Sequence, residues 1–157
     1  MGDSVTTPPR LTVGQGSEHH RLMSQAWSEI VARHRSELEA APAGEEFKLA
    51  RASIGALAEE IDRTCLGDRL FGWTSMHDLC IQQLNRPPYT CAYLRISPLR
   101  SGQVDFRYVD TPIESLQWHR IVAAQDTTRR FVGFLNQLKW VDRESAESLS
   151  ARFCHET

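Results

Sequence analysis

The spacing of apolar residues changes from a helical to a strand period partway along the chain, and this change limits the fold more than any other feature. Up to residue 65 apolar side chains recur every three or four positions, whereas from residue 89 to residue 109 they alternate with polar ones. The first spacing is typical of an amphipathic helix and the second of a half-buried strand. The chain therefore predicts an α+β domain in which helices and strands share one core.

Two long helices are expected in the first part of the chain. The apolar stripe predicts a helix over residues 18–41, with Ser17 as its N-cap and Pro42 just beyond its last turn. A second stripe predicts a helix over residues 44–65, which Gly67 can terminate. The short link between them favours an antiparallel helical hairpin.

A short third helix and a β-hairpin are expected next. Ser75 and Asp78 fit a capping box for a helix over residues 75–84, and the stretch before it is expected to be a loop. The alternating residues 89–96 and 103–109 predict two strands joined by a turn. Because a lone hairpin is marginally stable in water, it must lie on helices or gain strands from another chain.

The C-terminal part is expected to be helical again. Thr111, Pro112 and Glu114 form the clearest helix start in the sequence, and they predict a helix over residues 112–140. A new N-cap near Asp126 would divide it into two helices, and a last short helix is expected from Asp142. The predicted order is α-α-α-β-β-α-α, a mostly helical α+β fold with an antiparallel β-hairpin packed on helices.

One domain accounts for the length of 157 residues. We expect residues 1–16 to form a flexible N-terminal leader, because they are polar and contain Pro8 and Pro9, and residues 17–157 to form a single α+β domain. The leader lacks the apolar core of a secretory signal, and no later stretch is apolar enough to span a bilayer. The sequence therefore favours a cytoplasmic location, reduced cysteines and no membrane partner.

The charge balance makes nucleic acid an unlikely partner. The formal net charge is -2 and the isoelectric point is about 6.3, whereas nucleic-acid-binding domains usually carry a basic surplus. Lys48 and Lys139 are the only lysines among the 18 basic residues. A GC-rich bacterial genome explains this preference for arginine as well as phosphate binding does. A weaker nucleic-acid hypothesis would use Arg120, Arg129 and Arg130 with nearby aromatic residues.

Motifs of the common enzyme classes are missing from the sequence. It contains no glycine-rich nucleotide loop, no HExxH metal motif and no GxSxG nucleophile elbow. His77 and Cys80 stand three residues apart, and Cys91 and His119 offer further metal ligands. Cys80 equally fits the inner face of the expected helix as a small buried hydrophobe. We therefore predict neither a metal nor a cofactor, and the sequence leaves open whether the chain is an enzyme.

Aromatic and basic residues gather near the hairpin and in the segment after it. Tryptophan, tyrosine and arginine are enriched at protein interfaces. The candidate binding residues are Trp73, His77, Tyr93, Arg95, Arg107, Trp118, His119 and Arg120. A plainer interpretation is that the aromatic residues fill the junction between helices and sheet, with their polar ends in water.

Two functional hypotheses follow. The sequence favours a non-enzymatic binding or regulatory module that acts through a protein interface or as a homodimer, because an isolated hairpin has edges that can pair with a partner or a second copy. The alternative is a small enzyme or small-molecule-binding protein with a pocket between the hairpin and the helices, around Trp73, His77, Tyr93 and His119.

Overall fold

Five antiparallel strands form one sheet in chain order. The computed structural model describes residues 24–40 and 44–153, so the expected leader over residues 1–16 and the N-cap at Ser17 lie outside the described residues. Each strand pairs with the next one along the chain, so the sheet is a simple meander. The strands are β1 (Phe71–Ser75), β2 (Asp78–Gln82), β3 (Tyr93–Pro98), β4 (Gln103–Val109) and β5 (Trp118–Ala123).

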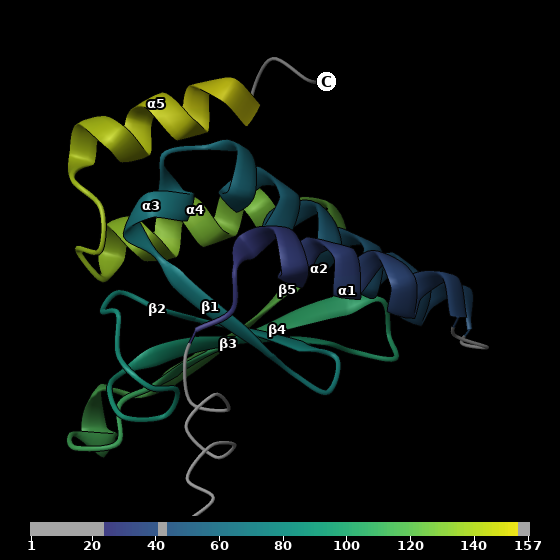
Figure 1. Ribbon diagram of the computed structural model, residues 1–157, viewed down its shortest axis with the longest axis horizontal. Coiled ribbons are helices and arrows are strands. Elements are labelled where there is room, and N and C mark those ends of the chain that lie inside the picture. The colour runs from purple at the N-terminus through teal and green to yellow at the C-terminus, as the bar shows by residue number, and fades with distance from the viewer. Residues whose placement is uncertain (1–23, 41–43, 154–157) are drawn as a thin grey trace, which may run out of the picture.

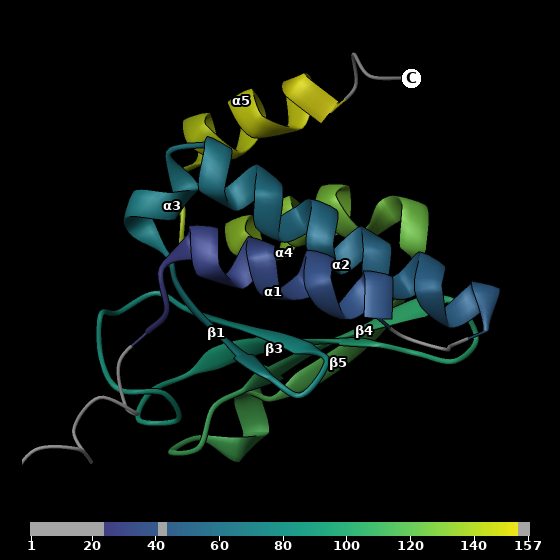
Figure 2. The same cartoon turned by 45° about the vertical axis from the view of Figure 1, so that its right-hand side comes forward.

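Helices cover one face of this sheet, and no described α-helix covers the other (Figures 1 and 2). Three long helices, α1 (Trp27–Ala40), α2 (Glu45–Arg63) and α4 (Thr127–Gln137), lie directly on the covered face. The short α3 (Leu66–Arg69) leads into β1, and α5 (Arg143–Phe153) lies on the outer side of the helical layer. We call the uncovered side of the sheet the open face.

The two helices predicted from the apolar periodicity of the N-terminal part are confirmed as α1 and α2. In α2 the buried positions include Ile54, Leu57 and Ile61, which follow the three- and four-residue spacing of the apolar stripe. Among the described residues of the expected helix over 18–41, residues 24–26 lie outside α1, because the backbone N–H of Gln25 donates to the carbonyl of Gly72 on β1 (2.9 Å). That bridge holds Gln25 beside the sheet and keeps it out of the helix.

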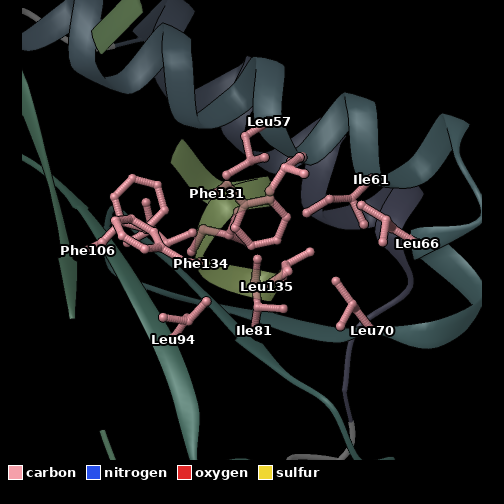
Figure 3. Packing of buried hydrophobic residues seen from close by; sticks show 14 of the residues in the cluster. Leu57, Ile61, Leu66, Leu70, Ile81, Leu94, Phe106, Phe131, Phe134 and Leu135 are labelled. Atoms are coloured by element: carbon pink, nitrogen blue, oxygen red, sulfur yellow. The ribbon is translucent and has the colours of Figure 1, made fainter. Parts of the chain in front are cut away.

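A single core fills the space between helices and sheet (Figure 3). Side chains from α2 and α4 point toward those of β2, β3 and β4, and Phe106 and Phe131 are both fully buried. The rings of Phe106 and Phe134 lie 5.0 Å apart, so the sheet and α4 are joined by aromatic packing. Alternate strand positions supply the inward side chains, which are Leu79, Ile81, Leu94, Ile96, Val104 and Phe106.

The helix expected over residues 75–84 is wrong, because these residues form a hairpin with the preceding segment. Residues 71–75, expected as a loop, are β1, and residues 78–82 are β2. Met76 lies in the connecting turn with a φ of 57°. Leu79 and Ile81 point to one face of the sheet at a spacing of two, which fits a strand and not a helix.

The helix expected over residues 112–140 is only partly correct. Its start signal at Thr111 and Pro112 leads to a single 3-10 turn, η2 (Glu114–Leu116). The chain then forms β5, because its aromatic and β-branched residues complete the sheet beside β4. After a second 3-10 turn, η3 (Ala124–Asp126), α4 begins at Thr127, where the sequence allowed a new N-cap.

The α+β class is therefore confirmed, and the predicted α-α-α-β-β-α-α order is corrected. The expected hairpin is present as β3 and β4, with Gly102 in its turn at a φ of 86°, although its first strand spans residues 93–98 and not 89–96. The sheet gains β1, β2 and β5, so the hairpin is not isolated. The last helix starts where expected, since the Ser145 N–H donates to Oδ1 of Asp142 (2.8 Å). Within the described ranges, no helix has the length and apolar character needed to cross a membrane.

Candidate interaction surface

Four of the candidate binding residues lie in one row across the open face. In the strand register Trp73 faces Cys80, Cys80 faces Arg95, Arg95 faces Arg107 and Arg107 faces His119. Side chains directly opposite one another in a sheet share a face. The meander thus brings together residues that are up to 46 positions apart in the sequence.

Aromatic rings occupy the β1 end of this row. Trp73 and Tyr93 are buried, and Tyr89, from the loop between β2 and β3, lies over them half-exposed. The three ring centroids lie 5.3–5.5 Å from one another in tilted or edge-on orientations. Nε1 of Trp73 is buried without a hydrogen-bond partner among the described residues. This cluster anchors the β2–β3 loop on the sheet, and burial raises the pKa of Tyr93.

Ion pairs occupy the middle of the open face. Arg95 donates to Asp78 (2.5 Å), and this hydrogen bond raises the pKa of Arg95. Arg107 lies 3.4 Å from Oδ2 of Asp105. The other oxygen of Asp105 lies 3.4 Å from Nδ1 of His119 but accepts no hydrogen bond from a described residue. The two arginines are thus each balanced by a carboxylate, so the open face is not a strong anion site.

The two aspartates were missed as site residues. Asp78 fitted a helix cap in the sequence, and only its pairing with Ser75 places it on β2. Asp105 alternates with inward-facing Val104 and Phe106, so its position beside Arg107 on one face could have been read from the strand period.

Trp118 and Arg120 lie on the opposite, helix-covered face. The Trp118 ring lies 4.9 Å from the ring of Phe134 on α4 and 5.9 Å from that of Tyr108. The guanidinium of Arg120 lies 5.6 Å from the Trp118 ring. For Trp118 the plainer interpretation therefore holds, since its ring packs at the junction of helix and sheet.

His77 is also separate from the row. It lies in the β1–β2 turn, where Nδ1 is 3.6 Å from Oε2 of Glu37 on α1. Its ring packs edge-on against Phe47 on α2, with centroids 6.0 Å apart. His77 thus connects the tip of the first hairpin to the helical layer.

The thiols show little sign of activation. Cys80 is fully buried, and burial raises its pKa to about 12, which keeps it protonated. The Cys91 thiol donates to Oε1 of Gln82 (3.3 Å). In the part of the chain that the structure describes, no three histidine, cysteine or acidic side chains converge as metal ligands. The spacing of His77 and Cys80 therefore reflects a turn and a strand, not one helix face.

Three pockets open around the helices. A cavity of about 380 Å³ lies beside the start of α1, one of about 510 Å³ lies between α3 and α5, and one of about 210 Å³ lies between α1 and α2. None of the three is lined by Trp73, His77, Tyr93 or His119. These three pockets therefore do not correspond to the ligand pocket of the alternative hypothesis.

The two edges of the sheet differ. On β1 the carbonyl of Gly72 accepts from the Gln25 N–H, and the N–H of Thr74 donates to the Gln25 side chain (3.0 Å). Gln25 thus bonds to both an outward carbonyl and an outward N–H of the β1 edge. The outer side of β5, which we call the β5 edge, has no such cover from another described segment.

The backbone groups of His119 and Ile121 point toward the β5 edge. At the β3–β4 turn the N–H of Leu99 donates to the carbonyl of Gln103. Hydrogen-bonded pairs alternate along an antiparallel ladder, so the odd-numbered β4 residues bond to β3. The backbone N–H and C=O groups of the even-numbered residues, such as Val104, therefore point toward β5. Their β5 partners are also even-numbered, which leaves His119 and Ile121 facing outward.

A side-chain contact agrees with this assignment. Nη1 of Arg120 donates to the carbonyl of His119 (2.8 Å), so this oxygen is open to a donor other than the backbone of β4. Apolar side chains lie along and before the same strand, with Ile121 52%, Leu116 52% and Ile113 50% exposed. The β5 edge therefore combines free backbone groups with exposed apolar surface.

Comparison with known proteins does not suggest a function, so a functional proposal has to be based on the fold and the surface. No protein-family model, no curated protein and no solved structure matches this chain significantly.

Proposed function

We propose that this protein is a non-enzymatic binding module that takes up an extended segment of a second polypeptide as an added strand at the β5 edge. The observation that carries the proposal is the contrast between the two edges, since Gln25 occupies β1 while the backbone groups of His119 and Ile121 face outward on β5. In strand addition, backbone hydrogen bonds supply affinity and alternate side chains supply specificity.

Side chains around β5 define the segment that fits. Ile121 projects from the open face beside the partly buried Asp105, and His119 lies beside Arg107 in the same face. An added strand therefore places one apolar side chain against Ile121, where burial of exposed apolar area favours binding. The arginines of the open face are paired within the chain, so the segment needs no acidic cluster.

The chemistry of the open face supports binding more than catalysis. Its arginines are held by Asp78 and Asp105, and its thiol at Cys80 is buried and protonated. A catalytic nucleophile needs a base within hydrogen-bonding reach, and no described base is hydrogen bonded to Cys80. The small-molecule hypothesis has less support, because core side chains pack in the space between sheet and helices where its pocket was expected.

Amide hydrogen exchange of the full chain tests the proposal. The probes are synthetic extended peptides, including one with the sequence of residues 116–124, added to the isotope-labelled protein. We expect bound peptide to slow exchange at His119 and Ile121, while Arg120, whose N–H faces β4, is already protected. Protection at neither outward amide, with every peptide and at millimolar protein, would contradict strand addition.

Proline substitutions give a matched pair of variants. Ile121→Pro removes an outward N–H and leaves the β4 ladder intact, so the protein should fold and lose peptide binding. Arg120→Pro removes an N–H that bonds to β4, so it should lower stability. If both variants behaved alike, the assignment of the β5 edge would be wrong.

A further inference from the structure

Resting on that proposed function, we infer that the strand added at the β5 edge is β5 of a second copy of this chain, in a two-fold dimer with Ile121 on the axis. An axis perpendicular to the joined sheet keeps every side chain on its own face. In antiparallel β5–β5 pairing one residue must then lie opposite its own copy. The register of the dimer therefore depends on which residue can lie on the axis, opposite its own copy.

The backbone pattern allows Arg120 or Ile121 on the axis, because both registers pair outward-facing residues. Charge selects Ile121. With Arg120 on the axis, two guanidinium groups would face each other, which is destabilising. With Ile121 on the axis, two half-exposed apolar side chains meet, and Arg120 lies opposite Val122 of the second copy. His119 then lies opposite Ala123 of the second copy. The backbone groups of His119 and Ala123 both point outward, so they can form hydrogen bonds with each other across the two copies.

A glycine in α4 supports the same contact independently. Gly133 is exposed in the middle of α4, with no atom within 4 Å of where a Cβ would lie. Glycine there is less favourable for a helix than alanine, and no contact in the described chain accounts for its presence. A second helix at close range would account for it, because glycine lets backbones approach.

The position of Gly133 matches the dimer geometry. The guanidinium of Arg130 lies 5.3 Å from the ring of Phe134, which in turn packs on Trp118 of β5. Gly133 follows Arg130 by three residues and so lies on the same side of α4. Because the two-fold axis leaves both helical layers on one side of the joined sheet, the two α4 helices become neighbours over the β5–β5 junction.

Arg120 competes with the second copy for one acceptor. Its hydrogen bond to the carbonyl of His119 uses the group that Ala123 of the second copy would reach. Association therefore brings two donors to one carbonyl oxygen. Arg120→Met keeps the aliphatic stem and removes the competing donor, so it should lower the dimer dissociation constant about tenfold.

Light scattering and sedimentation of the full chain, from micromolar to millimolar concentration, test the dimer. We expect a dimer that Ile121→Pro weakens at least about tenfold, and that Gly133→Leu also weakens. Ser36→Leu, exposed on α1 at the β1 side of the sheet, is the control and should leave association unchanged.

Cysteine pairs test the register in a chain with serine at residues 65 and 154. Ile121→Cys should form a covalent dimer under mild oxidation, because directly opposite Cα atoms are about 5.5 Å apart. His119→Cys should not, since its own copy is four residues, roughly 13 Å, away along the strand. Adding Ala123→Cys to His119→Cys should restore the crosslink.

The outcomes separate the two proposals. A strict monomer whose edge amides are still protected by a peptide would overturn the second copy and leave strand addition standing. A dimer that persists unchanged in Ile121→Pro would overturn this interface. A monomer without peptide protection would overturn both.

Discussion

Gly72→Ala should destabilise the protein although it adds only one methyl group. Gly72 lies on β1 directly beneath α1, and an added Cβ would lie 2.7 Å from Cη2 of Trp27 and 3.0 Å from Cδ1 of Ile30. Carbon atoms in contact prefer about 3.5–4.0 Å. The Trp27 indole would therefore have to retreat by about 1 Å.

The magnitude follows from what holds the indole in place. Trp27 is 8% exposed, and its Nε1 donates to the carbonyl of Leu70 at 3.0 Å. Overpacking costs about 1–3 kcal/mol, and a weakened hydrogen bond adds about 0.5–1.5 kcal/mol. The loss of glycine flexibility returns about 0.5–1 kcal/mol. We expect the free energy of unfolding to fall by about 2 kcal/mol.

Urea unfolding followed by tryptophan fluorescence and circular dichroism measures this change. Gly55→Ala is the matched control, because its Cβ would meet only Cβ of His34 at an ordinary 3.7 Å, and it should raise stability by about 0.5–1 kcal/mol. Trp27→Phe shrinks the ring and should rescue part of the loss in the double variant. An unchanged stability of Gly72→Ala, or no coupling to residue 27, would refute the steric argument.

Two further predictions concern titratable groups. Burial lowers the pKa of His34, and Arg51 adds to this effect although Glu37 opposes it. Below a pH of about 6.5 this histidine is protonated in the unfolded chain but resists protonation in the folded one. The free energy of unfolding should therefore decrease with falling pH. His34→Gln should flatten that slope in urea titrations between pH 5 and pH 8, and an unaltered slope would contradict the assignment. Exposed Cys65 should react with iodoacetamide in the native protein, whereas Cys80, with a pKa of about 12, should be labelled only on unfolding, as mass spectrometry of digested samples would show. Rapid native labelling of Cys80 would mean that β2 opens readily.

The helices were predictable where local pattern and packing agree. In α2 the apolar stripe ending at Ile61 faces the core, so the periodicity of the sequence reports the burial directly. Residues 75–84 and 112–126 were not predictable in this way. Leu79 fits the inner face of a helix together with Cys80 and that of a strand together with Ile81, and Thr111 with Pro112 starts a single turn before β5 begins. Pairing with β3 and β4 resolves both ambiguities.

Part of the candidate site could be predicted from the sequence. Tyr93, Arg95 and Arg107 alternate on two expected strands, so their shared face followed from the strand period. Trp73 and His119 join them only through the added strands β1 and β5. Trp118 and Arg120 leave the group for the same reason, because a strand turns neighbouring residues to opposite faces.

By itself the sequence determined that helices and strands would share one interior, since apolar spacing depends only on local geometry and on the need to remove those side chains from water. The tertiary structure decided which strand has a free edge. Whether Gln25 covers β1, and whether Ile121 turns its N–H outward, depends on register between segments distant in the chain. Hydrogen bonding across a sheet is non-local, so no spacing within one segment can encode it.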